Sequence, residues 1–300
     1  MSTIVTGPVC ATVPATSANL GPGYDALGLA LRLRDRVTAR LADGPEEITV
    51  TGEGAGTVPL DHTNLVHLAM RRAFEQMGCD TPPLRLSCEN VIPHGRGLGS
   101  SSAAIVAGIC LARGLVTGGL RLMDDDSVFA LAADIEGHPD NVAAAFYGGF
   151  TIAYADGPRS RAISVALDPR ISAVAFVPPD SVQTSMARAL LPPVVPHADA
   201  ASNAGRTALL VAALCGRPEL LFAATEDRLH QDYREPVMPR TLALMRALRA
   251  EGLPAVVSGA GPTVLVLTDD SMQPEVAASV PDGWRTLELS LETTGVRLDR

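Results

Sequence analysis

Residues 95–102 of the chain, Gly-Arg-Gly-Leu-Gly-Ser-Ser-Ser, combine closely spaced glycines with three consecutive hydroxyl side chains. Glycine lets a backbone approach a polyphosphate closely, and a helix start offers unpaired N–H groups and the positive end of its dipole. A serine hydroxyl is also a suitable ligand for Mg²⁺. The segment therefore indicates a phosphate-binding loop, followed by a small-residue helix that serines can cap.

The basic residues of this chain are all arginines, 24 in number, and no lysine occurs. This composition excludes a Walker-A phosphate lysine, a lysine Schiff base and a lysine general base. The charge of a phosphate bound at residues 95–102 must therefore be offset by Mg²⁺, by arginine or by the loop itself.

Other interpretations of the glycine-rich segment fit less well. A dinucleotide-binding loop requires a glycine at position 100, where Ser100 stands, and an acidic residue about 20 positions further on. The Gly-x-Ser-x-Gly turn of an α/β-hydrolase is not present in the segment. A glycine turn that serves only to pack a helix tightly stays open on this segment alone.

The overall composition narrows the class of protein. Among 300 residues, 47% are hydrophobic and 19% charged, and no apolar run reaches membrane-spanning length, so we expect a globular chain without a membrane segment. The opening residues lack the basic start and apolar stretch of a secretory signal, which favours the cytoplasm. The net charge of −9 would repel a polyanion, so nucleic acid is not an expected partner. Five cysteines without a Cys-x-x-Cys spacing indicate neither a disulfide framework nor a zinc site.

The elements that would position the glycine-rich segment can be read from the pattern of the first half. Residues 9–13 are expected to be extended, with a break at Pro14 into a loop that leads to the apolar run Ala26–Leu31. Apolar residues alternate with polar ones from Leu84 to Cys88, as in a half-buried strand. The glycine-rich turn and its helix follow, so a strand and a helix would frame the predicted phosphate site.

The second half alternates apolar strands with helical stretches. Residues 173–177 predict a strand, and Pro239 opens a helical segment that Gly252 ends. Residues 255–270 predict a strand, a glycine turn and a second strand, and residues 284–292 predict a final strand. This mixed order favours an α+β fold over regular βαβ winding.

Loop-like composition marks a division of the chain. Residues typical of turns gather around Gly157, Pro158 and Pro169. We therefore expect an N-terminal domain over residues 1–160 and a C-terminal domain over residues 161–300.

Three segments, PATSANLGPGYDALGLAL, PHGRGLGSSSAA and SGAGPTVLVL, resemble in this order the three motifs of GHMP kinases. The first of them, together with EGHPDNVAAAFYGG, is most similar to homoserine kinases. The resemblance implies a two-domain fold, with an N-terminal domain like ribosomal protein S5 domain 2 and a ferredoxin-like C-terminal domain. It also implies the ATP-dependent phosphorylation of the L-homoserine hydroxyl in threonine biosynthesis. Because the family commonly dimerises, a homodimer is implied as well.

The resemblance also implies where ATP and Mg²⁺ bind. The triphosphate would lie along Gly97–Ser102, with Ser101 as the serine ligand of Mg²⁺ and Glu136 as the metal carboxylate. Asp134 stays open as the alternative carboxylate, although Glu136 aligns better. The residues implied in ATP binding are Asn64, Pro93, Gly95, Arg96, Gly97, Leu98, Gly99, Ser100, Ser101 and Ser102.

L-Homoserine carries an ammonium, a carboxylate and a hydroxyl, so its site needs an acid, a base and a polar clamp. Asp25 could pair with the ammonium. Arg188 and Arg234 match the family's arginines near the carboxylate, which an arginine can hold with two parallel hydrogen bonds. The substrate residues suggested by charge and resemblance are Asn19, Asp25, His138, Asp140, Thr184, Arg188 and Arg234.

The reaction itself depends mainly on alignment and electrostatics, because the phosphoryl transition state is loose. Some GHMP kinases use an aspartate as general base, and Asn141 stands where that residue would be. An amide cannot take the proton, so we predict no dedicated protein base and place Asn141 with Glu136 and Ser101 in the catalytic group. Asp140 stays open as a rival base.

Two other functions stay open on the sequence. Another GHMP kinase, of mevalonate or shikimate type, would share the phosphate site, but EGHPDN and the paired arginines favour an amino acid as substrate. The second alternative is a catalytically silent ligand sensor of the same fold, and Ser101 with Glu136 argues against it.

Overall fold

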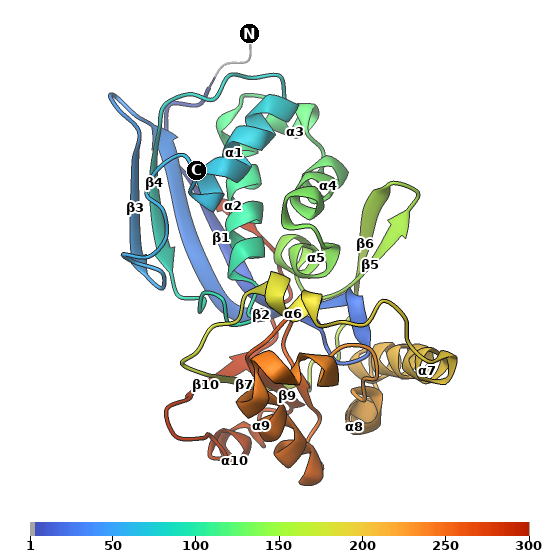
Figure 1. The fold of residues 1–300 in the computed structure, drawn as a ribbon. Coiled ribbons are helices and arrows are strands. Elements are labelled where there is room, and N and C mark those ends of the chain that lie inside the picture. The colour runs from blue at the N-terminus through green and yellow to red at the C-terminus, as the bar shows by residue number, and fades with distance from the viewer. Residues whose placement is uncertain (1–3, 300) are drawn as a thin grey trace.

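The computed structural model describes residues 4–299, which form two β-sheets packed against helices (Figure 1). The first sheet has seven strands and the second has four. The larger core extends from the first sheet to one face of the second, where it includes Ala173, Ala175 and Leu265, and the smaller core lies on the other face of the second sheet. The expected α+β fold is confirmed. Within the described residues, no helix is long and apolar enough to cross a membrane.

The first sheet is built on the long hairpin of β1 (Val9–Asn19) and β2 (Gly23–Leu41). The strand order is β11-β1-β2-β4-β3, and β5 pairs with the first part of β2 and with β6. Strands β3 and β4 run parallel and the other pairs run antiparallel. The remaining strands are β3 (Glu47–Gly52), β4 (Leu84–Asn90), β5 (Phe150–Asp156), β6 (Arg159–Val165) and β11 (Arg297–Asp299). The strand expected over residues 84–88 is confirmed by β4.

The expectation that Pro14 ends the first strand is wrong. Strand β1 continues to Asn19, with a shift of register against β2 between Pro14 and Ala15. Such an irregularity tolerates a residue that has no backbone N–H to donate. The loop between the two strands therefore covers only residues 20–22. Left-handed backbones are found in and beside it, at Asn19 (φ 68°), Leu20 (φ 51°) and Asp25 (φ 54°).

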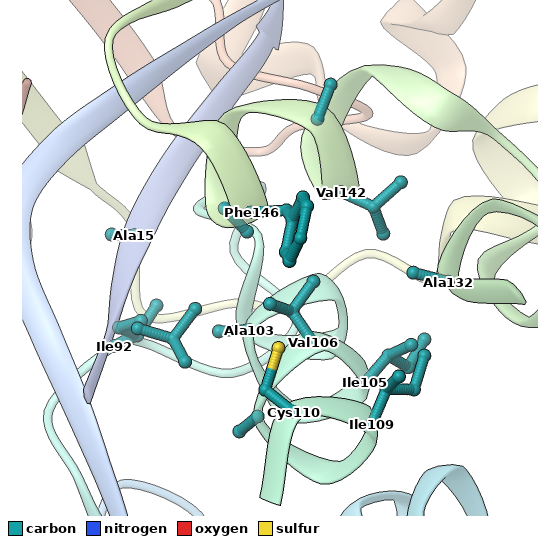
Figure 2. Close-up of a cluster of buried hydrophobic side chains, with 14 of the residues drawn as sticks. Ala15, Ile92, Ala103, Ile105, Val106, Ile109, Cys110, Ala132, Val142 and Phe146 are labelled. Atoms are coloured by element: carbon teal, nitrogen blue, oxygen red, sulfur yellow. The ribbon is translucent and has the colours of Figure 1, made fainter. Parts of the chain in front are cut away.

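Helices α1 to α5 cover one face of the first sheet (Figure 1). Helix α2 is buried along most of its length, and Figure 2 shows its Val106 and Cys110 beside Phe146 of α5. The small residues of α2 allow this close packing: a Cβ on Gly108 would lie 2.5 Å from the carbonyl oxygen of Val66 in α1. The helices are α1 (Leu65–Gln76), α2 (Ser100–Leu115), α3 (Gly119–Leu122), α4 (Asp125–Glu136) and α5 (Pro139–Tyr147).

Helix α2 follows the glycine-rich segment, as expected, but a glycine forms its N-cap. Gly99 holds this position with a left-handed backbone (φ 72°), and among residues 4–299 no side chain caps the helix. The expectation that serines cap it is therefore wrong. The serines form the first turn instead, where their N–H groups have no partners within the helix.

The second sheet has the order β10-β7-β9-β8 and is antiparallel throughout. Its strands are β7 (Ser172–Val177), β8 (Ala255–Val257), β9 (Val264–Thr268) and β10 (Arg285–Ser290). Helices connect β7 to β8 and β9 to β10, which is the ferredoxin-like arrangement. The strands expected within residues 173–177, 255–270 and 284–292 are confirmed.

The connection from β7 to β8 is long and mostly helical. Helix α9 begins at Pro239, as the sequence predicts. The helices of this connection are α6 (Thr184–Ala189), α7 (His197–Leu214), α8 (Leu221–Ala224) and α9 (Pro239–Ala250), with the 3₁₀ turns η1 (Pro218–Leu220) and η2 (Asp232–Val237). Helix α10 (Gln273–Ala277) connects β9 to β10.

The turn between β8 and β9 joins the two domains. Its Ser258 Oγ donates to the Gly97 carbonyl oxygen (2.6 Å), and its Gly259 N–H donates to the Ala18 carbonyl oxygen (3.0 Å). A side chain at Gly97 would collide with this turn, because a Cβ there would lie 2.3 Å from the Ser258 carbonyl oxygen. The glycine-rich segment is therefore held by both domains.

The division between the sheets lies slightly beyond the boundary expected at residues 160 and 161. Strand β6 continues the first sheet to Val165, and the second sheet begins at Ser172. Strand β11 then returns to the first sheet and pairs with β1 (Figure 1).

Candidate functional site

A cavity of about 430 Å³ lies where the two domains meet. The first domain lines it with the glycine-rich segment and the α4–α5 connection, and the second with residues 181–188, η2 and the β8–β9 turn. Segments far apart in the sequence are therefore brought around one cavity. The predicted site residues that line it are Asn19, Gly95, Gly97, Gly99, Ser100, Ser101, Glu136, His138, Asp140, Asn141, Thr184, Arg188 and Arg234.

Some predicted residues do not line this cavity. Leu98 is fully buried in the core. Arg96 donates to the carbonyl oxygens of residues 178 and 179, and it lines a separate hollow with Pro93. Their side chains therefore hold the loop in place rather than facing the cavity. The predicted residues outside its lining are Asp25, Asn64, Pro93, Arg96, Leu98 and Ser102.

The start of α2 forms one wall of the cavity. The N–H groups of its first turn and the helix dipole favour an anion there. A Cβ on Gly99 would lie 1.9 Å from Thr16 Oγ1, so a larger residue does not fit. Thr16 Oγ1 in turn donates to Asn141 Oδ1 (2.8 Å), which fixes Asn141 beside this wall. The arrangement suits a bound phosphate.

Glu136, the last residue of α4, faces the serines of α2. Its Oε1 accepts hydrogen bonds from Ser101 Oγ (2.6 Å) and Ser102 Oγ (2.8 Å), and its side chain is 8% exposed. Among the described residues its nearest ion-pair partner is His138, whose Nε2 lies 3.9 Å away. An enclosed carboxylate with hydroxyl neighbours and no arginine partner has oxygen atoms to offer a cation. Asp134 is exposed and does not line the cavity.

Asp140 is buried and engaged with its neighbours. Its Oδ1 accepts the backbone N–H of Asn141 (2.7 Å) and lies 3.0 Å from Nδ1 of His138. Burial lowers the pKa of His138, but the hydrogen bond to Asp140 and the charges of Asp140 and Glu136 raise it more, so the net shift of this pKa is upward. The imidazole therefore adds positive charge to the cavity more readily than an isolated histidine would.

Arg188 of the second domain lines the cavity and forms an ion pair with Asp25. Arg188 donates from Nη1 to Asp25 Oδ2 (3.0 Å) and from Nη2 to Asp25 Oδ1 (2.5 Å). Its Nη1 also donates to the hydroxyl of Tyr24 (3.0 Å). The hydrogen bonds to Asp25 raise the pKa of Arg188. Asp25 is thus connected to the cavity through Arg188.

Arg234 reaches the cavity although only 1% of its surface is exposed. Its Nη1 donates to the Gly259 carbonyl oxygen (2.9 Å) and lies 3.1 Å from His230 Nδ1. Its Nε has no hydrogen-bond partner within residues 4–299. Burial lowers the pKa of Arg234 from its ordinary value. An enclosed cation with unused donors is suited to an anionic ligand.

A second cavity of about 270 Å³ adjoins the first, because Ser100 and Ser101 line both. Its walls are largely apolar, and Asn64 lies among them. The Asn64 amide donates to the Pro59 carbonyl oxygen (2.9 Å) and accepts the N–H of Val66 (3.0 Å). Its side chain therefore caps α1 and also shapes this cavity.

Sequence reasoning missed several residues around the two cavities. Burial raises the pKa of Asp35 in the second cavity to about 6, although Asp35 accepts two backbone N–H groups. Tyr24 lies near both Arg188 and Arg234, whose Cζ atoms are 5.6 Å and 5.8 Å from its ring centroid. His230 contacts Arg234. The spacing of four residues between His230 and Arg234 was the one signal that could have suggested this contact.

Comparisons with known proteins agree with this geometry. The family model for the GHMP kinase N-terminal domain matches residues 64–149, and that for the GHMP kinase C-terminal domain matches residues 209–285. A homoserine kinase of Streptomyces avermitilis is 54% identical over 283 residues, which cover 94% of this chain and 93% of that protein. A homoserine kinase of Clavibacter michiganensis is 50% identical over 289 residues, covering 94% and 91%. The crystal structure of homoserine kinase from Cytophaga hutchinsonii has a TM-score of 0.84 and 25% identity, with 97% of each chain covered.

Proposed function

This chain belongs to the homoserine kinases of the GHMP kinase superfamily, and from that premise we propose that it transfers the γ-phosphoryl group of ATP to the hydroxyl of L-homoserine. One observation carries the proposal. The first domain lines the main cavity with an anion-binding helix start and the Glu136 carboxylate, and the second domain lines it with Arg188 and Arg234. A polyphosphate and a zwitterionic alcohol can therefore meet in one cavity.

ATP would occupy both cavities. The second, largely apolar cavity suits the base, and the shared Ser100 and Ser101 lead the triphosphate past the start of α2 into the first. Asn64 would border the base, with one amide N–H left to donate after its bond to Pro59. The N–H groups of the first helical turn would hold the phosphates without any lysine.

Ser101 and Glu136 suit Mg²⁺, because this ion prefers hydroxyl, carboxylate, phosphate and water oxygens. Within the described residues no group of three or more His, Cys, Asp and Glu side chains is arranged to hold a metal, so phosphates and waters would complete the coordination. The ion would neutralise charge on the phosphates. Exposure of Asp134 supports Glu136 as its carboxylate ligand.

L-Homoserine would take over the ion pair between Asp25 and Arg188. Its ammonium would pair with Asp25, and its carboxylate with Arg188 and Arg234. A zwitterion leaves every charge with a partner, whereas mevalonate or shikimate, each with a carboxylate and no ammonium, would leave Asp25 unpaired. The amide of Asn19 supports Asp25, because its Oδ1 accepts the Asp25 N–H (2.9 Å) and its Nδ2 donates to the Gly259 carbonyl oxygen (2.8 Å).

The transfer would need alignment more than a protein base. Asp140 already accepts from Asn141 and contacts His138 through one oxygen, so its contacts support a structural role for it. Asn141, held by Thr16 beside the start of α2, would orient the reacting groups. The hydroxyl proton would leave to phosphate or to water.

The test is Mg²⁺-dependent ADP release with L-homoserine, L-serine, mevalonate and shikimate offered separately. Release with L-homoserine alone is expected. Release with mevalonate or shikimate instead would keep the phosphate site and refute the assignment of Asp25 to an ammonium. No release with any of them would point to a ligand sensor of the same fold.

A further inference from the structure

His230 has no part in the proposed reaction, yet it connects two segments that hold the substrate. Its side chain is fully buried. Its Nε2 lies 2.7 Å from the Gly21 carbonyl oxygen in the β1–β2 loop, and its Nδ1 lies 3.1 Å from Nη1 of Arg234. One ring thus bridges the loop that precedes Asp25 and the enclosed arginine of the second domain.

The two contacts determine the protonation state of the ring. A carbonyl oxygen can only accept a hydrogen bond, so Nε2 must carry the hydrogen that faces Gly21. A guanidinium can only donate, so Nδ1 must present its lone pair to Arg234. Both conditions are met by the neutral Nε2–H tautomer alone. A second proton on Nδ1 would face the N–H of Arg234 and place two cations in contact.

The surroundings of the ring support this neutral form. Its charged neighbours are Arg234 and Asp227, whose Oδ1 lies 3.7 Å from Nε2. The Asp227 carboxylate accepts hydrogen bonds from the backbone N–H groups of residues 229, 230 and 231. These hydrogen bonds partly offset its negative charge. The Tyr24 ring packs against the imidazole with centroids 5.1 Å apart. Burial lowers the pKa of His230, with the charge of Arg234 acting in the same direction and those of Asp227 and Asp25 opposing it.

The contact with His230 also determines which donors of Arg234 stay available. Nη1 carries two hydrogens, and its two acceptors are the Gly259 carbonyl oxygen and His230 Nδ1. Both hydrogens are therefore used, and the plane of the guanidinium is fixed. Nε has no partner within the described residues. The Nε and Nη2 donors are left as a parallel pair, which is the geometry that binds a carboxylate through both oxygens.

We infer that His230 is a positioning residue for Arg234: as a neutral Nε2–H imidazole it orients the guanidinium toward the substrate carboxylate and sets its place relative to the β1–β2 loop. The inference rests on the proposed function, because it assigns the carboxylate of that substrate to Arg234. Beyond the assignment of Arg234 to the substrate carboxylate, the inference requires that His230 be the neutral Nε2–H tautomer.

The first test compares His230→Leu with His230→Gln in steady-state kinetics. Leucine removes both contacts, so the KM for L-homoserine should rise roughly 10- to 100-fold while the KM for ATP changes less than about twofold. An amide can donate to Gly21 and accept from Arg234, so His230→Gln should stay within about threefold of wild type. His67→Leu, which removes another buried histidine in the first domain, is the control for general destabilisation. Equal rises of both KM values, or a glutamine variant as poor as the leucine variant, would overturn the inference.

The second test separates an effect through Arg234 from an independent one. If His230 acts through the guanidinium, the double variant His230→Leu/Arg234→Met should have the same kcat/KM for L-homoserine as Arg234→Met, within about twofold. If the losses of kcat/KM in the two single variants multiplied in the double variant, His230 would act independently of Arg234. If the wild-type protein phosphorylates a different one of the four alcohols, the proposed function is wrong. The same comparison of variants, made with that alcohol, would still decide the role of His230, because all four alcohols carry a carboxylate.

The third test needs no turnover. In the ¹⁵N spectrum of histidine-labelled protein at pH 7, the signals that disappear in His230→Gln should have the shifts of a neutral Nε2–H imidazole. Shifts of an imidazolium or of the Nδ1–H tautomer would refute the inference whatever the protein phosphorylates.

Discussion

Asp25 and Arg188 form a two-bond ion pair although they are 163 residues apart in sequence and belong to different domains. About one third of each side chain is exposed, and an exposed pair of this kind contributes little to stability. The pair can therefore open at small cost when a ligand offers each member a new partner. This exchange gives the site a means of preferring a zwitterion.

Asp25→Asn should raise the KM for L-homoserine roughly tenfold or more, because the amide keeps the size of the side chain and loses the charge that attracts the ammonium. The KM for ATP should change less than about twofold. Steady-state kinetics with each substrate varied in turn measures both. Asp126→Asn, which opens an exposed ion pair with Arg161, is the matched control. Equal effects on both substrates would remove Asp25 from the ammonium site.

Glu136→Gln should raise the Mg²⁺ concentration needed for half-maximal activity by about tenfold or more, because a neutral amide is a poor ligand for this ion. The measurement is a Mg²⁺ titration of ADP release at saturating ATP and L-homoserine. Asp134→Asn should behave as wild type, since Asp134 is exposed and away from the cavity. The reverse outcome would transfer the metal carboxylate to Asp134.

Asp140→Asn should lower kcat by less than about tenfold if no protein base operates, because asparagine can still accept the N–H of Asn141. The quantity to measure is kcat at saturating concentrations of both substrates. A loss of 10² to 10⁴ in kcat with little change in KM is what a true base would give, and it would identify Asp140 as that base.

Asp35→Asn should stabilise the protein at alkaline pH. Burial raises the pKa of Asp35 from 3.8 to about 6. The contribution of the protonated side chain to stability is therefore full below pH 3.8, the pKa in the unfolded chain, and is lost as the pH rises through about 6. Asparagine cannot ionise, so the variant should be more stable than wild type by up to about 3 kcal/mol at pH 8 and by much less at pH 4. Urea denaturation without ATP at both pH values measures the difference. A variant less stable than wild type at pH 8 would contradict this.

Much of the fold follows from local patterns in the sequence. The alternation of apolar and polar residues over 84–88 predicts β4. Pro239 marks the first turn of α9, because the backbone N–H that proline lacks would have no partner within the helix at this position. Pro14 shows the limit of such reasoning. A proline inside a strand is allowed where the register shifts, and that shift depends on the partner strand rather than on the local sequence.

The candidate site divides in the same way. Residue types and their spacing, together with the family resemblance, indicate that the glycine-rich segment, Glu136 and the two arginines belong to the site. They do not indicate His230, whose contact with Gly21 spans 209 positions and exists only after the domains meet. They place Arg96 near ATP because it lies within the motif, whereas its side chain binds carbonyl oxygens of the second domain. The homodimer implied by the resemblance stays a prediction that light scattering can test.

The pairing of β11 with β1 has a consequence for how the protein is made. The outer edge of β1 at Cys10–Thr12 is covered by residues 297–299, which are synthesised after all the strands of the second sheet. Arg34 of β2 forms an ion pair at 3.1 Å with Glu292, which is also synthesised after the second sheet. The nucleotide-binding half therefore cannot mature during translation ahead of the other half, because its sheet is completed by a strand that is synthesised after the second sheet. Both halves should therefore reach their final form together, with the open edge of β1 exposed to chaperones until β11 pairs with it.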